Sequence, residues 1–213
     1  MKYLGCITGL VGWSLVLYAT LSHAQSSIPI GHVTALEGDV MGRHAGSTAA
    51  ERLSIQSPVY QDDLIQTLAA AKVKLVLVDG TVLTLGPDSA LRLTEYVYTP
   101  SSSAQKSVVQ VFFGAIRAVV QHVLPGGTVE MRTSNAVAAI RGTDWMARVE
   151  SDATAVVVLE GMVSVRQARP AVGGAVVLTA GMGTDVRADQ APTPPKQWGT
   201  PRIEALRQAT TLP

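Results

Sequence analysis

The stretch that decides the fold is "KVKLVLVDGTVLTLGPDSALRLTEYVY", residues 72–98. In its first part the apolar residues Val73, Leu75 and Leu77 recur at every second position, the period of a half-buried strand. Asp79 and Gly80 then separate this run from a second one, "TVLTL". Asp-Gly is a strong hairpin signal because the tight turn between two strands needs positive φ angles. The stretch therefore predicts a β-hairpin.

The same pattern of apolar runs and turn residues extends from residue 31 to about residue 189. Short runs rich in Val, Leu, Ile and Thr are separated by Gly, Asp, Asn or Pro at roughly eight- to twelve-residue spacing, which is typical of an all-β domain. The motif Leu-Glu-Gly-x-Val occurs twice, at 36–40 and 159–163, and predicts strand-to-strand turns at both places. We expect a single all-β domain of many short strands, arranged as packed sheets or as a β-helix-like, jelly-roll-like winding.

Two segments require a choice between helix and other structure. "VVQVFFGAIRAVVQHVL", residues 108–124, could form an apolar helix, but its β-branched content and central Gly114 favour two strands bent at the glycine. Residues 190–213 begin as a proline-rich linker, "QAPTPPKQWGTP". The following "TPRIEALRQA" predicts a short helix with Thr200 as N-cap and Pro201 at its first position. With so few apolar residues, that helix is marginal unless it docks on the domain.

The N-terminus has the pattern of a secretory signal, residues 1–24. Lys2 precedes an apolar run, and small Ser22 and Ala24 occupy the −3 and −1 positions of a cleavage site before Gln25. An uncleaved membrane anchor is the alternative, because the apolar run approaches the length of a span. Cleavage would remove Cys6, the only cysteine, so we expect no disulfide and no stable membrane span in the mature protein. We therefore expect a protein that is exported from the cytoplasm.

Composition and motifs exclude several functions. Hydrophobic residues make up 47% of the chain and charged residues 15%, enough apolar content for a packed core. The formal charge of +1 argues against nucleic-acid binding. No histidine has a second His or a Cys at metal-ligand spacing, and no nucleophile elbow or phosphate loop is present, so we expect no metal, no cofactor and no enzyme activity. A carbohydrate-active site built from Asp62, Asp63 and Asp144 remains a distant alternative, since turns favour Asp in any case.

The segment "AIRGTDWMARV", residues 139–149, places a charged step between two apolar halves. In one interpretation it is a corner, where Gly142 permits a bend, Asp144 caps the backbone or pairs with Arg141, and Trp145 packs in the core. In the other it is a recognition site, where a guanidinium and a large aromatic ring meet a ligand or partner. Composition favours the corner and leaves recognition open.

Taken together, the segments resemble the periplasmic domain of the FecR family. The order of "GHVTALEGDV", "PVYQDDLIQT", "VDGTVLTLGPDSALRLTEYVY", "VQVFFGAIRAV", "MRTSNAVAAIRGTDWMARV" and "VVVLEGMVSV" is similar to that family over residues 31 to 188. The resemblance implies an all-β domain with no catalytic residues, in a periplasmic or secreted protein of a Gram-negative envelope. It also implies fold-defining motif positions, which could also serve interaction: Asp79, Gly80, Thr81, Arg141, Gly142, Thr143, Asp144, Glu160 and Gly161.

In founding members of that family, the domain senses the signalling domain of an outer-membrane iron-siderophore transporter. Those members also carry a cytoplasmic helical segment before a membrane span, and that segment controls a sigma factor. Only five residues precede Cys6 here, so we do not expect sigma-factor regulation to carry over. We expect a non-catalytic periplasmic binding or signalling module that contacts an envelope protein through an edge strand or the tail. The alternative is a secreted or surface structural scaffold.

Overall fold

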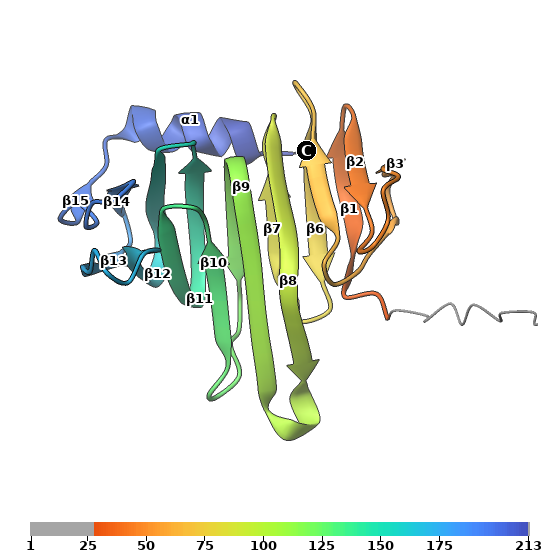
Figure 1. Ribbon diagram of the computed structural model, residues 1–213, viewed down its shortest axis with the longest axis horizontal. Helices are drawn as coiled ribbons and strands as arrows, with labels where there is room; N and C mark the ends of the chain where they lie inside the picture. The colour runs from red at the N-terminus through yellow and green to blue at the C-terminus, as the bar shows by residue number, and fades with distance from the viewer. Residues whose placement is uncertain (1–27, 213) are drawn as a thin grey trace, which may run out of the picture.

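The computed structural model describes residues 28–212, which form fifteen strands, one 3-10 turn and one helix (Figure 1). The predicted signal peptide, residues 1–24, lies outside this range. The elements are β1 (Gly31–Glu37), β2 (Val40–Arg43), β3 (Glu51–Arg52), β4 (Pro58–Val59), β5 (Leu64–Thr67), β6 (Lys72–Leu77), β7 (Val82–Leu85), β8 (Ser89–Thr99), η1 (Pro100–Ser102), β9 (Ala104–Val120), β10 (Thr128–Arg132), β11 (Ala136–Val149), β12 (Ala153–Gln167), β13 (Ala175–Thr179), β14 (Met182–Arg187), β15 (Lys196–Gln197) and α1 (Thr200–Thr210). The all-β prediction with a short C-terminal helix is confirmed.

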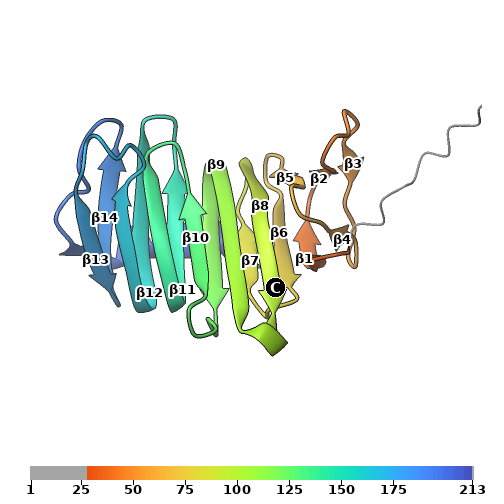
Figure 2. The same cartoon turned by 60° about the horizontal axis from the view of Figure 1, so that its bottom comes forward.

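The strands are hydrogen-bonded into one continuous sheet that folds over on itself into two layers (Figure 2). One layer, which we call the open sheet, runs in the order β3, β2, β5, β8, β9, β10, β11, β12 and β13. The other, the covered sheet, runs β4, β1, β6, β7, β9, β11, β12, β14 and β15. Of the predicted arrangements, packed sheets describe the fold best, and the chain also winds repeatedly between them.

Three long strands belong to both layers, because each exchanges partners at a glycine with positive φ. β9 pairs with β8 before Gly114 and with β7 after it. β11 pairs with β10 before Gly142 and with β9 after it. β12 pairs with β14 before Gly161 and with β13 after it. The predicted pairs of short strands are thus single bent strands of 17, 14 and 15 residues.

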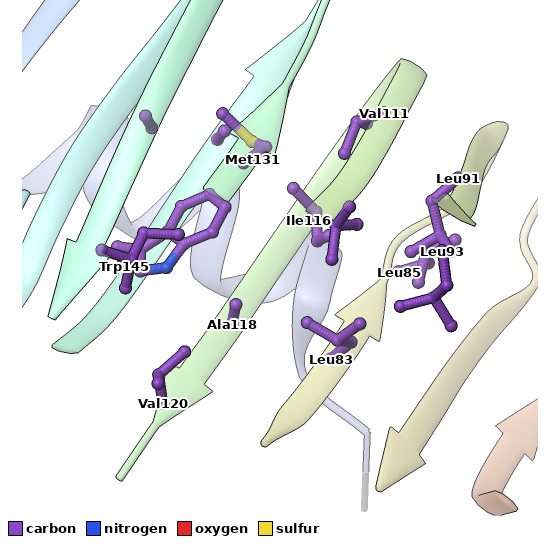
Figure 3. Close-up of a cluster of buried hydrophobic side chains, with 14 of the residues drawn as sticks. Leu83, Leu85, Leu91, Leu93, Val111, Ile116, Ala118, Val120, Met131 and Trp145 are labelled. Carbon is purple, nitrogen blue, oxygen red and sulfur yellow. The ribbon is translucent and has the colours of Figure 1, made fainter. Parts of the chain in front are cut away.

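The main core fills the space between the layers. Buried residues alternate along the strands, as in β6, where Val73, Leu75 and Leu77 point inward as predicted. Trp145 of β11 and Met131 of β10 contribute large side chains from opposite layers (Figure 3). Burial of such apolar side chains, each contributing roughly 1.5–3 kcal/mol, holds the two layers together without a disulfide.

The predicted hairpin is present, and so are the strands predicted in place of a helix at residues 108–120. β6 and β7 are antiparallel, and Gly80 in their turn has a φ of 81°. The turn predicted at Glu37–Gly38 connects β1 to β2, but Glu160–Gly161 is not a hairpin turn and lies inside β12. It is the bend at which that strand changes layers, which a local sequence motif does not distinguish from a turn.

Helix α1 lies across the outer face of the covered sheet (Figure 1). Leu206 packs with Ala115, Met146 and Val157 in a second, smaller hydrophobic cluster. The ammonium group of Lys72 donates to the carbonyl oxygens of Gln208 and Thr211 at 2.9 and 3.0 Å, so it satisfies acceptors at the helix end. The helix is therefore docked on the covered sheet. The sequence predicts a stable helix here only if it docks in this way.

The start of the helix is fixed by Trp198. Its N-cap is Gly199 rather than the predicted Thr200, because Thr200 already adopts helical geometry. The ring of Trp198 is 4% exposed and occupies the space where a side chain on Gly183 would be. The guanidinium of Arg202 stacks 3.5 Å from the centre of that ring and forms an ion pair with Asp185.

Trp198→Ala should lower the free energy of unfolding by about 3 kcal/mol, because it removes a buried aromatic side chain and leaves a cavity. The amides of α1 should also lose hydrogen-exchange protection ahead of the sheet. Chemical denaturation and amide exchange measure the two effects. Lys196→Ala, at an exposed position of β15, is the control and should change neither quantity. Unchanged protection of α1 in Trp198→Ala would contradict this account of the docking.

Candidate functional site

The predicted corner at residues 139–149 is a β-bulge within β11, where the pairing with β12 shifts between Arg141 and Asp144. The bulge meets the bend of β12 directly. A Cβ atom on Gly161 would lie 2.5 Å from the carbonyl oxygen of Gly142, so the two backbones approach too closely for a side chain there. The backbone bends here, as the corner interpretation expects.

Asp144 does not pair with Arg141. Its two carboxylate oxygens accept hydrogen bonds from Nε and Nη2 of Arg117 at 2.9 and 2.6 Å, a bidentate pair between the neighbouring strands β11 and β9. This bond to Asp144 raises the pKa of Arg117 above its ordinary value, despite the opposing effect of burial. The bulge explains the difference from the prediction, because it turns Arg141 and Asp144 toward different neighbours. Trp145 is 2% exposed in the core, as the corner interpretation expects.

Arg141 instead projects from the outer surface, where it lines two adjoining pockets. One pocket, of about 320 Å³, lies under the loop 121–127 and is also lined by His122 and Gly142. The other, of about 410 Å³, lies over β10–β13 and is lined by apolar side chains that include Met162 and Val177. The pockets share Arg141 and Gly127, and we call them together the Arg141 groove. Arg141 forms no ion pair with any residue in the range 28–212.

The predicted motif residues Asp79, Gly80 and Thr81 support one wall of this groove from a distance. The carboxylate of Asp79 accepts hydrogen bonds from the backbone N–H of Thr81 at 2.9 Å and from the side-chain amide of Gln105 at 3.1 Å. The carbonyl oxygen of that amide accepts from the backbone N–H of Leu124 at 2.7 Å. Asp79 thus fixes the loop 121–127 through a single bridging side chain.

Tyr96 completes this network from the opposite layer. Its hydroxyl accepts a hydrogen bond from the backbone N–H of Asp79 at 3.0 Å. Burial, followed by the charge of Asp79, raises the pKa of Tyr96 well above its ordinary value, so its hydroxyl stays neutral. Sequence reasoning missed Tyr96, Gln105 and Arg117, because nothing in the local pattern marks a polar partner that lies far away in the chain.

The outer face of the open sheet has more unpaired positive than negative charge. Glu95 pairs with Lys106 and Glu130 pairs with Arg132, so both acidic groups on this face are neutralised. Lys106 holds the pKa of Glu95 below its ordinary value. Four arginines on the face form no ion pair with a described residue: Arg43, Arg92, Arg141 and Arg166. Sequence reasoning also missed Met162 and Val177. The alternation of inward and outward side chains along β12 and β13 could have identified both as exposed.

The acidic residues considered for catalysis are separated into different interactions. Asp63 is 2% exposed and accepts hydrogen bonds from His44 and from the backbone N–H of Tyr60, both at 2.8 Å, near β5. Asp144 of β11 accepts hydrogen bonds from Arg117 of β9. Asp62 is half-buried, and its backbone N–H donates to the carbonyl oxygen of Leu93 at 2.8 Å. The motif residue Glu160 is exposed beside the bulge. Among residues 28–212, no group of three or more His, Cys, Asp or Glu side chains could hold a metal ion. No helix in that range is long and apolar enough to cross a membrane.

Comparison with known families assigns the central part of the chain. Residues 63–164 match the model of the family described as "FecR protein". After this match, we call residues 63–164 the FecR domain. The resemblance in the sequence is thereby confirmed, and the FecR domain contains the motif residues from Asp79 to Gly161. Most of the Arg141 groove belongs to the FecR domain, whereas Val177 and α1 lie beyond the matched range.

Two solved structures have a similar fold. Both are crystal structures of a "putative anti-sigma factor" from Parabacteroides distasonis ATCC 8503, at 1.65 and 2.50 Å resolution. They are 19% and 20% identical to this chain, with TM-scores of 0.54 and 0.53. Each match covers 68% of this chain and 64% of the other, so the likeness concerns the fold of a shared part. No curated protein matches the chain. The FecR match fits a signalling or regulatory module.

Gly161→Ala should destabilise the FecR domain far more than Gly142→Ala. The first substitution creates a clash with the carbonyl oxygen of Gly142, and we expect a loss of about 3 kcal/mol in the free energy of unfolding. At Gly142 a Cβ atom meets nothing nearer than 3.8 Å and the φ of 55° is one that alanine can adopt, for a loss of about 1 kcal/mol. Urea denaturation of the two variants measures the difference. Equal losses would show that the close approach is not the constraint.

The pair His44–Asp63 predicts a pH dependence of stability. The hydrogen bond to Asp63, then the charges of Asp63 and Glu51, raise the pKa of His44 in the folded protein, against a smaller effect of burial. Protonated His44 therefore stabilises the fold fully below about pH 6.5, and this stabilisation is lost as pH rises through the raised pKa. Urea denaturation between about pH 6 and about pH 8 should show a decline in the wild type that His44→Gln lacks. His122→Gln, at an exposed position, should keep the decline. A decline unchanged in His44→Gln would contradict the assignment.

Proposed function

We propose that this protein is an exported, non-catalytic signalling module that acts in the periplasm by protein–protein contact. In this proposal the contact surface is the outer face of the open sheet, with the Arg141 groove at its centre. The single observation that carries it is the difference between the two sheets. The covered sheet buries its outer face under α1, whereas no described segment lies over the groove.

The side chains of this face support a contact of that kind. Met162 is 54% exposed and Val177 is 51% exposed, and both line the groove beside Arg141. Apolar side chains next to an arginine with no ion pair are typical of the positions that dominate protein–protein interfaces. Steering by the surrounding positive charge would speed the encounter with an acidic partner.

Export is supported by the sequence of residues 1–24, which has a basic start, an apolar run and small residues before Gln25. The family supports the same compartment, because FecR domains are typically periplasmic. N-terminal sequencing of the protein recovered from the periplasm should therefore begin at Gln25. A start at Met1 in the membrane fraction would overturn the exported, cleaved form.

Site-specific photo-crosslinking tests the contact surface. A photoreactive residue in place of Met162 should yield one discrete crosslinked product in intact cells, because this position lies in the groove. The same residue in place of Ala205, which is exposed on α1, should yield no such product. Arg141→Glu added to the Met162 variant should abolish the product, since it reverses the charge at the centre of the surface. Equal crosslinking from both positions, or none from Met162, would overturn the proposal.

A structural scaffold would give a different result. In that case the crosslinked products would form a ladder of copies of this chain in surface assemblies or in the culture medium. Mass spectrometry of the crosslinked bands distinguishes a ladder of this chain from a single different protein.

A further inference from the structure

Four strands in residues 28–212 have a hydrogen-bonded neighbour on one side only, and they are not alike. Three of them, β3, β4 and β15, are two residues long and contain a charged residue or proline: Glu51–Arg52, Pro58–Val59 and Lys196–Gln197. These are the features with which proteins protect a free edge. β13 has none of them. It is five residues long, reads Ala-Val-Val-Leu-Thr, and forms the free edge of the open sheet.

We propose that β13 is a docking edge, to which an extended segment of the protein partner adds as a further strand of the open sheet. The inference rests on the proposed function and names the mode of contact and the chemistry of the partner. The added segment carries an acidic residue opposite Arg166 and an apolar residue two positions along, beside Val177.

The backbone of β13 is arranged for this addition. Gln167 N–H donates to the carbonyl oxygen of Gly174 at the start of the hairpin. Hydrogen-bonded and non-hydrogen-bonded pairs alternate along an antiparallel ladder. The next pair, Arg166 with Ala175, is therefore of the second kind, and so is Ser164 with Val177. The N–H and C=O groups of Ala175, Val177 and Thr179 consequently point away from β12, toward the free edge.

The side chains next to that edge specify an acidic and apolar segment. Arg166 lies directly across from Ala175 in the register, and alanine is too small to block it from a residue on the next strand. Arg166 forms no ion pair with a described residue, and its one hydrogen bond, to the carbonyl oxygen of Gln167, is 3.3 Å long. A carboxylate on the added strand can accept a bidentate hydrogen bond from it. Two residues along, exposed Val177 offers an apolar neighbour.

The same charges argue against a second copy of this chain as the occupant. Pairing two β13 strands would bring together two open sheets, each with unpaired Arg92, Arg141 and Arg166 on its outer face. Like charges at such an interface are unfavourable. An acidic partner removes this repulsion, whereas self-association increases it.

The experiment uses a fluorescein-labelled peptide of nine residues in which aspartate and valine alternate, added to the full mature protein. Anisotropy should show saturable binding that weakens as salt is raised. A peptide with lysine in place of aspartate should bind at least about tenfold more weakly, because its charge is reversed. Hydrogen exchange should show new protection of the amides of Ala175, Val177 and Thr179 in the bound state, a result that side-chain contact alone does not produce.

Two pairs of variants separate the backbone from the side chains. Val177→Pro removes the N–H that faces the free edge and should abolish binding, while Val177→Thr keeps that N–H and should bind within about threefold of the wild type. Arg166→Gln should weaken binding by about tenfold, because the charge is lost. Arg148→Gln, at an exposed position on the outer face of the covered sheet, is the charge-loss control and should change peptide binding by less than about twofold. Circular dichroism and melting confirm that each variant folds, and the amide protection in the wild type does not depend on any variant.

The outcomes distinguish this inference from the proposed function. Peptide binding that survives Val177→Pro, or no new protection at the three amides, would overturn strand addition. A concentration-dependent dimer without peptide binding would make a second copy the occupant and overturn the inference as well. In either case, crosslinking from Met162 to a different protein would still support contact through the open face.

Discussion

The backbones of Gly142 and Gly161 lie so close together that neither the bulge in β11 nor the bend in β12 can change without the other. This contact stands at the point where two long strands leave one layer and enter the other, while β9 makes the same passage at Gly114. The core depends on it, since Trp145 follows the bulge directly and is placed between the layers by it. The Arg141 groove depends on it too, because the same bulge directs Arg141 outward.

The bulge in β11 also determines which of the charged residues around it are paired. Asp144 and Arg141 are three positions apart, yet Asp144 is neutralised by Arg117 within the covered sheet and Arg141 stays unpaired at the surface. On the open face, Glu95 and Glu130 likewise form ion pairs, with Lys106 and Arg132. The motif residues of the FecR domain therefore do two things. They build the crossing between layers, and they leave a defined positive charge beside it.

Sequence reasoning predicts the fold class well, because hydrophobic alternation and Asp79–Gly80 are local signals that the hairpin preserves. It predicts the bend at Gly114 and the buried Trp145 for the same reason. It fails for the partner of Asp144, since Arg117 lies 27 residues away and no local pattern relates the two. It also places a turn at Glu160–Gly161, because a glycine that ends a strand and one that carries a strand between layers look alike. The groove arises only when β10–β13 and the loop 121–127 meet in space.

The continuous path of β9, β11 and β12 through both layers has a mechanical consequence. In a sandwich whose layers touch only through side chains, a shearing force can slide one layer over the other. Here three stretches of covalent backbone tie the layers together, and each is clamped by hydrogen-bond ladders on both sides of its glycine. A force applied at one edge strand is transmitted to the opposite layer through the backbone of these strands. Under load the domain would move as a stiff body. A force applied at an edge strand would therefore reach helix α1 with little deformation of the sheets between them.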